Sequence, residues 1–200
     1  MVDGFLPGAD RPHEACGVFG IYAPGEDVAR ITFFGLFALQ HRGQESAGIA
    51  VSDGYRATLY KKMGLVSQVF NEENLGPLHG HVAIGHVRYS TADSSRAVSA
   101  QPFLFESALG PIAVAHNGNL VNVGMVRDEL FRRGVGLTSW CDTEMMAQLL
   151  AGAPGENWLE RIRHTLPLLE GAYSLTILTR DKLFAVRDPW GFRPLAMGRL

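Results

Sequence analysis

Short apolar runs, bounded by glycine, proline or polar residues, recur along the chain and alternate with longer apolar stretches. The short runs predict strands over residues 17–23, 46–52, 57–62, 82–87, 112–115, 173–178 and 183–186, with a further candidate over 193–197. The longer stretches predict helices over residues 28–39, 123–133, 143–151 and 158–169, the last of them bent by Pro167. This order favours an α+β fold in which two sheets pack on each other with helices outside, rather than an alternating parallel βαβ array.

The two ends of the chain depart from this pattern. Residues 1–15 contain Pro7, Gly8 and Pro12, show neither helical nor strand periodicity, and are expected to form an extended tail. They have no basic start and no apolar central region, so they do not read as a secretory signal. Arg199 and Leu200 follow a strand-like segment with no cap or turn, so we expect a domain that is incomplete at its C-terminus.

Composition narrows the class of protein. Hydrophobic residues make up 46% and charged residues 19% of the chain, which is enough apolar material for a folded core. A net charge of −2 and the lack of a Lys/Arg-rich run argue against nucleic-acid binding. The longest apolar stretch, Ile31–Leu39, is too short to span a membrane. Two cysteines without CxxC spacing make no disulfide framework, so we expect a cytoplasmic protein with free thiols.

Cys16 is the first candidate for chemistry. A lone cysteine that opens a buried strand can be a small core residue. However, the sequence before Cys16 looks dispensable and the sequence after it looks folded. Removal of residues 1–15 would give Cys16 a free α-amine, whose pKa of roughly 7.7–8.0 suits a general base at neutral pH. One residue would then supply both the nucleophile and its base.

Two further motifs carry groups that bind charge. Arg88 ends a predicted strand, where a guanidinium can hold a carboxylate through two parallel hydrogen bonds, although a surface ion pair is the simpler alternative. Asn117-Gly118 favours a turn, and a tight turn would place an Asn amide and a Gly N–H side by side. Two convergent donors are what an oxyanion hole needs.

Asp142 and three histidines complete the candidates. Asp142 precedes a predicted helix and can serve as its N-cap, with Ser139 as the other candidate cap, or its carboxylate can pair with an ammonium group. Together with Arg88, it would then clamp the zwitterionic end of an amino acid. The spacing of His79, His81 and His86 leaves a zinc site conceivable, but it places His86 on the opposite strand face from the other two. We therefore predict no metal site in this chain.

The ordered set of motifs resembles the class II glutamine amidotransferases, and in particular the glutaminase domain of the amidophosphoribosyltransferase family of purine synthesis. The resemblance covers nearly all of residues 16–200. It rests on CGVFGIY at 16–22, LQHRGQESAGIA at 39–50, IGHVRYST at 84–91, AQPF at 100–103, AHNGNL at 115–120, DTE at 142–144 and AVRDPWGFRPLAMGRL at 185–200.

The resemblance implies a four-layer αββα sandwich of the N-terminal nucleophile hydrolase type, and a role for each matched residue. Residues 1–15 would be a propeptide that is cleaved between Ala15 and Cys16, and residues 16–200 the glutaminase domain. Cys16 would be the nucleophile on the glutamine carboxamide, and Asn117 and Gly118 the oxyanion donors. For substrate binding, the implied residues are Arg88 for the α-carboxylate, Asp142 for the α-ammonium, and Thr91 in a loop that closes over glutamine.

The resemblance also implies partners. Ammonia would pass to a phosphoribosyltransferase domain beyond residue 200, where it attacks phosphoribosyl pyrophosphate to give 5-phosphoribosylamine. Mg²⁺, and an iron–sulfur cluster in some relatives, would belong to that domain, and the longer protein would form a homo-oligomer. No cofactor is expected in this chain. Two alternatives stay open: a class II amidotransferase with another acceptor, and an uncleaved precursor that binds glutamine without turnover.

Two residues depart from the family pattern. Cys141 stands where a Ser is more usual, which places a second thiol beside Asp142. Asp93 stands where a Gly is usual, which would change how the loop after Arg88 closes.

Overall fold

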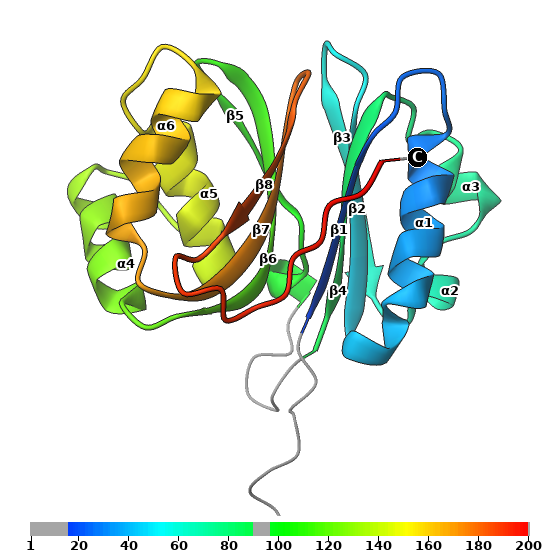
Figure 1. Ribbon diagram of the computed structural model, residues 1–200, viewed down its shortest axis with the longest axis horizontal. Coiled ribbons are helices and arrows are strands. Elements are labelled where there is room, and N and C mark those ends of the chain that lie inside the picture. The colour runs from blue at the N-terminus through cyan, green and yellow to red at the C-terminus, as the bar shows by residue number, and fades with distance from the viewer. Residues whose placement is uncertain (1–15, 90–96, 200) are drawn as a thin grey trace, which may run out of the picture.

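Two antiparallel sheets of four strands each form the centre of the molecule (Figure 1). The computed structural model describes residues 16–89 and 97–199. Sheet A has the strand order β1-β4-β2-β3, made of β1 Gly17–Tyr22, β4 Val82–Arg88, β2 Ser46–Ser52 and β3 Ala57–Met63. Sheet B has the order β5-β6-β7-β8, made of β5 Phe103–Ser107, β6 Gly110–Leu120, β7 Gly171–Thr179 and β8 Leu183–Arg187.

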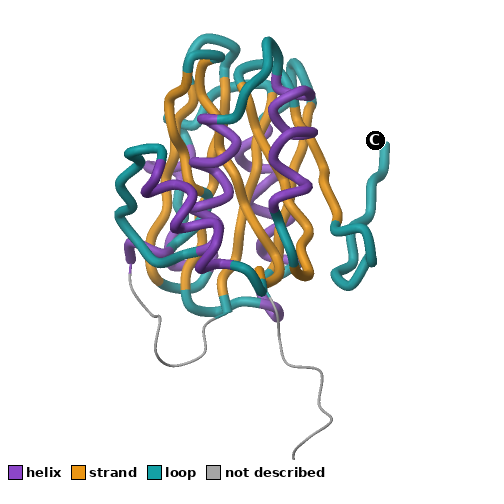
Figure 2. Tube along the Cα trace, turned by 90° about the vertical axis from the view of Figure 1, so that its left-hand side faces the viewer, coloured by secondary structure: helices purple, strands orange, loops and turns teal. Residues whose placement is uncertain are grey.

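Helices cover the outer face of each sheet, so that the molecule has four layers (Figures 1 and 2). Sheet A is covered by α1 Val28–Ala38, α2 Val66–Val69 and α3 Glu72–Leu75. Sheet B is covered by α4 Val123–Arg132, α5 Asp142–Gly152 and α6 Trp158–Thr165. Short 3₁₀ turns lie at Gln40–Arg42, Ala97–Ser99 and Leu166–Leu168. The predicted α+β sandwich of two sheets with helices outside is confirmed.

Most predicted elements are present, and the differences have local causes. Residues 193–197 form no strand, because Arg187 and Asp188 hold the backbone of residues 190–193 in a compact turn instead. The helix predicted over 158–169 ends at Thr165, and the 3₁₀ turn Leu166–Leu168 follows it at Pro167. The sequence pattern does not predict three of the observed elements, which are β5 and the single-turn helices α2 and α3.

The first helix packs unusually close to sheet A. Asp27 caps its N-terminus by accepting a hydrogen bond from the backbone N–H of Arg30 at 3.0 Å. At Gly35, a Cβ atom would lie 2.5 Å from the ring of Phe19 on β1, so only glycine lets the helix approach this closely. This contact fixes α1 over β1, the strand that Cys16 precedes.

Three apolar clusters stabilise the four layers. One lies between sheet B and its helices, and another between sheet A and its helices. The third, which we call the inner cluster, fills the space between the sheets and consists of the buried residues Ala50, Val82, Ile84, Ala113, Ala115 and Leu178. Its members are mostly small, so the two sheets pack closely on each other. None of the helices in the described part of the chain has the length and apolar content needed to cross a membrane.

Candidate active site

The space between the sheets changes from apolar to polar toward one end. Successive residues of a strand point to opposite faces, so residues in step with the inner cluster also face the other sheet. On sheet A these are His86 and Arg88, which follow Ile84, and Cys16, which precedes Val18. Asn117 follows Ala115 on sheet B in the same way. The candidate residues therefore meet where the inner cluster ends.

Strand pairing places Cys16 next to Arg88. In the antiparallel pair of β1 and β4, Gly17 lies opposite Val87, so the residue before β1 lies beside the end of β4. The Cys16 thiol donates to the carbonyl of Tyr89 at 3.8 Å, and Arg42 Nε donates to the carbonyl of Cys16 at 3.3 Å. Burial raises the pKa of Cys16, and the positive charge of Arg88 only partly opposes this. The surroundings alone therefore do not produce a thiolate at neutral pH, and the thiol needs a base.

Arg88 lies at the strand end, as the sequence predicts, but it already faces a carboxylate. Its Nε atom is 3.8 Å from Oε2 of Glu45, and both side chains are largely buried. The backbone N–H of Glu45 also donates to the carbonyl of Arg88 at 3.0 Å. This pairing fixes the guanidinium near Cys16. The simpler alternative of a solvent-exposed surface ion pair is wrong.

Asn117 and Gly118 lie inside β6 rather than in a turn, so the turn interpretation is wrong. They pair with Ser174 and Tyr173 of β7. Gly118 has φ +152°, and a Cβ atom there would lie 1.9 Å from the carbonyl oxygen of Ala172, so no other residue fits. Asn117 is buried, and its Oδ1 atom has no hydrogen-bond partner among the described residues. An unpaired buried amide is costly unless a ligand or water completes it.

Asp142 is the first residue of α5 rather than its cap. The N-cap position is held by Cys141, and no side-chain cap is formed. Instead, the Asp142 carboxylate accepts the backbone N–H of Leu120 at 3.3 Å and lies 3.4 Å from Nδ1 of His116. Burial raises the pKa of Asp142, but His116 and the hydrogen bonds outweigh it, so the pKa is lowered overall. An ionised carboxylate is thus held near Cys16, whose pKa it also raises.

Sequence reasoning missed the residues that hold these groups in place. Glu144 accepts hydrogen bonds from the backbone and hydroxyl groups of both Thr138 and Ser139, which orders the segment before Asp142. Gln101 accepts the backbone N–H of His116 at 2.8 Å. Glu144, Gln101 and His116 lie within the quoted motifs DTE, AQPF and AHNGNL, whereas Thr138 and Ser139 precede DTE. Ser139 is not the helix cap that the sequence also allows, because Cys141 holds that position. A polar residue at a position with inward strand or helix parity is the signal that could have found them.

The second thiol, Cys141, lies beside the site. Its Sγ atom is 3.8 Å from Oδ1 of Asp142, and burial raises its pKa, with Asp142 adding to the effect. It is therefore a neutral thiol at physiological pH. Both cysteines are free.

Some residues singled out from the sequence lie outside the described part of the chain, and one prediction about two histidines is wrong. Ala15, Thr91 and Asp93 lie in stretches that the structure does not describe. His79 and His81 precede β4 instead of lying on it, so their predicted shared strand face is wrong. Within residues 16–89 and 97–199, no three His, Cys, Asp or Glu side chains are grouped so that they could hold a metal ion.

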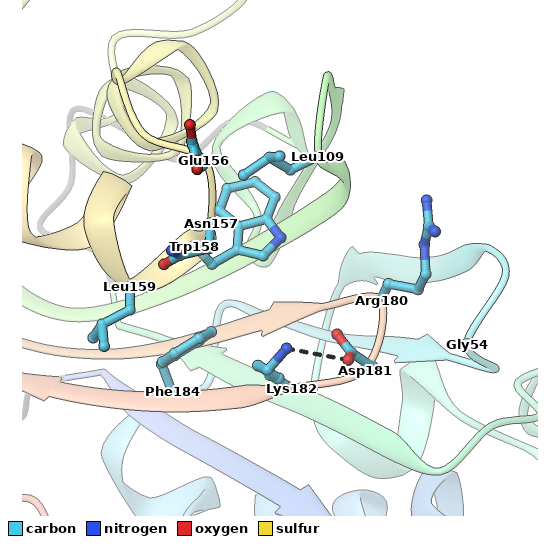
Figure 3. Close-up of a pocket in the computed structure, with 10 residues that line it drawn as sticks. All are labelled: Gly54, Leu109, Glu156, Asn157, Trp158, Leu159, Arg180, Asp181, Lys182 and Phe184. Atoms are coloured by element: carbon cyan, nitrogen blue, oxygen red, sulfur yellow. Dashed lines mark hydrogen bonds and ion pairs between the residues drawn. The ribbon is translucent and has the colours of Figure 1, made fainter.

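A separate pocket of about 680 Å³ lies at the other end of the sandwich (Figure 3). Its lining comes from the β2–β3, β5–β6 and β7–β8 turns, from β8, and from the start of α6 and the segment before it. Two acidic and two basic side chains balance each other, and Lys182 pairs with Asp181 at 3.2 Å. The lining has no thiol or hydroxyl group.

The fold and the site together define a class. A four-layer αββα sandwich, with a cysteine placed just before the first strand and facing the second sheet, is a fold of the N-terminal nucleophile hydrolase type. Within that class, the chain belongs to the glutamine amidotransferase domain family, whose model matches residues 86–200.

Curated proteins with a single name, amidophosphoribosyltransferase, are similar to nearly all of the chain. The amidophosphoribosyltransferase of Synechococcus elongatus is 55% identical over 193 residues, which cover 96% of this chain and 39% of that protein. The amidophosphoribosyltransferase of Methanocaldococcus jannaschii is 51% identical over 187 residues, which cover 92% of this chain and 40% of that protein. The chain therefore spans about two fifths of the length of these relatives.

Solved structures with the same fold point to the same family as these sequence matches. The glutamine phosphoribosylpyrophosphate amidotransferase of B. subtilis, complexed with ADP and GMP, superimposes with a TM-score of 0.85 at 40% identity. That match covers 92% of this chain and 39% of the B. subtilis chain. The predicted relationship to the glutaminase domain of this family is confirmed.

Proposed function

We propose that this chain is the glutaminase domain of an amidophosphoribosyltransferase, which hydrolyses the amide of glutamine and supplies ammonia to phosphoribosyl pyrophosphate. One observation carries the proposal. Strand pairing places Arg88 beside Cys16, and the Asp142 carboxylate is close enough to raise the pKa of Cys16, so a thiol, a cation and an anion lie at one polar end of the sandwich. A free amino acid carries a carboxylate and an ammonium group that match this pair.

The chemistry begins with the release of the Cys16 amine. Cleavage between Ala15 and Cys16 would free an α-amine whose pKa, roughly 7.7–8.0, lets it accept the thiol proton. Because burial raises the pKa of the Cys16 thiol, a base of this kind is needed to form the thiolate at neutral pH. A chain in which the amine remains in a peptide bond is expected to be inactive.

The thiolate would then attack the carboxamide carbon of glutamine. The carbonyl oxygen gains negative charge, which the Asn117 amide and the Gly118 N–H would stabilise as oxyanion donors. Breaking the C–N bond, with return of the proton to nitrogen, releases ammonia and leaves a thioester on Cys16. Water hydrolyses the thioester to glutamate and restores the thiol.

The binding roles follow from charge. Arg88 would bind the α-carboxylate and Asp142 the α-ammonium of glutamine, while Thr91 belongs to the loop proposed to close over it. Transfer of the ammonia to phosphoribosyl pyrophosphate would need the part of the longer relatives that this chain does not match.

The test combines intact mass, N-terminal analysis and glutamine hydrolysis. Protein that begins at Cys16 is expected to release ammonia from glutamine and to take up one equivalent of a diazoketone analogue of glutamine on Cys16. Cys16→Ala is expected to lose both properties, whereas Cys141→Ser, the matched control, keeps both. Hydrolysis by protein verified as uncleaved would contradict the role of the amine, and an adduct on Cys141 would overturn the choice of nucleophile.

A further inference from the structure

The proposed active site is divided between two sheets. Cys16 and Arg88 belong to sheet A, whereas Asn117 and Gly118 belong to β6 of sheet B. The inner cluster holds the sheets together through apolar contacts, which are not directional. An oxyanion hole requires its donors to be placed within a fraction of an ångström of the developing charge. A directional contact between the sheets is therefore needed near Asn117.

His86 supplies such a contact. It lies on β4, two residues before Arg88, and its side chain is fully buried between the sheets. Its Nε2 atom is 3.0 Å from the carbonyl oxygen of His116, the residue before Asn117. Burial lowers the pKa of His86 to about 3, so the ring is neutral and Nε2 carries the proton that is donated to this carbonyl.

The backbone of His116 depends on side chains for its hydrogen bonds. The last residue of β6 that pairs with β5 is Val114, which lies opposite Phe103, so His116 lies beyond the end of β5. The N–H group of His116 donates to Oε1 of Gln101, and its carbonyl oxygen accepts the hydrogen bond from Nε2 of His86. The peptide plane between His116 and Asn117 is thus fixed on this side by a residue from the other sheet.

We infer that His86 is a positioning residue that aligns the oxyanion donors of sheet B with the nucleophile of sheet A. This inference rests on the proposed glutaminase function. His86 does not touch the substrate in this scheme, because its donor is used by the His116 carbonyl. Its effect is expected in the rate of the chemical step, since the carboxylate and ammonium of glutamine are bound by other groups.

The chain offers a matched control at the other end of the sandwich. Ser52, at the end of β2, donates its hydroxyl to the carbonyl of Arg180 in the β7–β8 turn at 2.7 Å. This bond also joins the two sheets, and Ser52 is as buried as His86. Ser52→Ala therefore removes a comparable contact far from Asn117.

The test compares steady-state glutamine hydrolysis by the processed protein and its variants. His86→Phe is expected to lower kcat by at least about tenfold and to leave KM within about threefold, because one oxyanion donor alone can contribute about 10²–10³ in rate. His86→Gln places an amide N–H near the position of Nε2 and is expected to recover kcat to within about threefold. His86→Asn, whose donor is too short to reach, is expected to behave like His86→Phe. Ser52→Ala is expected to keep the wild-type kcat.

A second readout does not depend on activity. Amide hydrogen exchange at residues 116–118 is expected to speed up in His86→Asn but not in His86→Gln or Ser52→Ala. A wild-type kcat in both His86→Phe and His86→Asn, or an equal loss in Ser52→Ala, would overturn the inference. If the wild-type protein does not hydrolyse glutamine, the proposed function fails. Unchanged amide exchange at residues 116–118 in His86→Asn would refute the positioning role independently of activity.

Discussion

At the scale of single residues, Gly118 is the described glycine at which an added Cβ atom would meet the shortest contact. Its Cβ atom would overlap the carbonyl oxygen of Ala172 at 1.9 Å and approach Nε2 of His116 at 2.8 Å. Any side chain must therefore push β6 away from β7 or twist the peptide that carries the Gly118 N–H. The role proposed for this N–H makes such a shift a catalytic defect as well as a structural one.

We predict that Gly118→Ala lowers kcat for glutamine hydrolysis by about 10²-fold or more, the loss expected for one oxyanion donor. The melting temperature should fall as well, because the clash is with backbone atoms. Gly124→Ala is the control: it lies in α4 with nothing within 4 Å of the new methyl group, and should be stabilising by roughly 0.5–1 kcal/mol. Steady-state kinetics measures kcat and thermal unfolding measures stability for the two variants. A wild-type kcat in Gly118→Ala would exclude the Gly118 N–H from catalysis.

At the scale of elements, α5 illustrates how a helix start is fixed without a conventional cap. Burial opposes ionisation of Glu144, but the hydrogen bonds from Ser139 and Thr138 outweigh it, so its pKa is lowered. Each carboxylate oxygen accepts two of these bonds. The segment that leads into Asp142 is thus tied to the first turn of the helix.

We predict that Glu144→Gln lowers the free energy of unfolding by about 1–3 kcal/mol at pH 7, because the amide NH₂ replaces an acceptor that two donors need. The lowered pKa makes the contribution of Glu144 fully present above its unfolded value of roughly 4.3, and it disappears as the pH falls through the folded value. The difference between the two proteins should therefore shrink below about pH 4. Denaturant unfolding at several pH values checks this, with the exposed Glu106→Gln on β5 as control. A constant difference would show that ionisation of Glu144 is not involved.

The sequence predicts those elements whose local pattern agrees with their final environment. The apolar pattern predicts the strand over 46–52 with its observed bounds, since every residue in it is buried. By contrast, β6 extends through Asn117 and Gly118, because pairing with β7 overrides the turn preference of an Asn-Gly pair. The sequence places Asp142 at the correct end of its helix, but its partners Leu120 and His116 come from another element, which local sequence cannot reveal.

At the scale of the whole molecule, all three apolar clusters contribute to stability, but only the inner cluster lies between the two halves of the proposed site. The outer clusters bind helices to sheets, whereas the inner cluster sets the separation of the two sheets that carry the two halves of the proposed site. A change of equal size should therefore affect activity only when it is made between the sheets. Ala113 and Ala29 are both fully buried, one in the inner cluster and the other in the cluster between α1 and sheet A.

We predict that Ala113→Val and Ala29→Val each cost about 1–3 kcal/mol of stability, because overpacking forces neighbours out of their preferred rotamers. Ala113→Val should also lower kcat about tenfold, since a wider gap between the sheets moves Asn117 away from Cys16, whereas Ala29→Val should stay within about twofold of wild type. Unfolding curves and kcat measured on the same preparations separate the two effects. An equal loss of kcat in both variants would mean that activity follows overall stability, and that the spacing of the sheets has no special part in aligning the site.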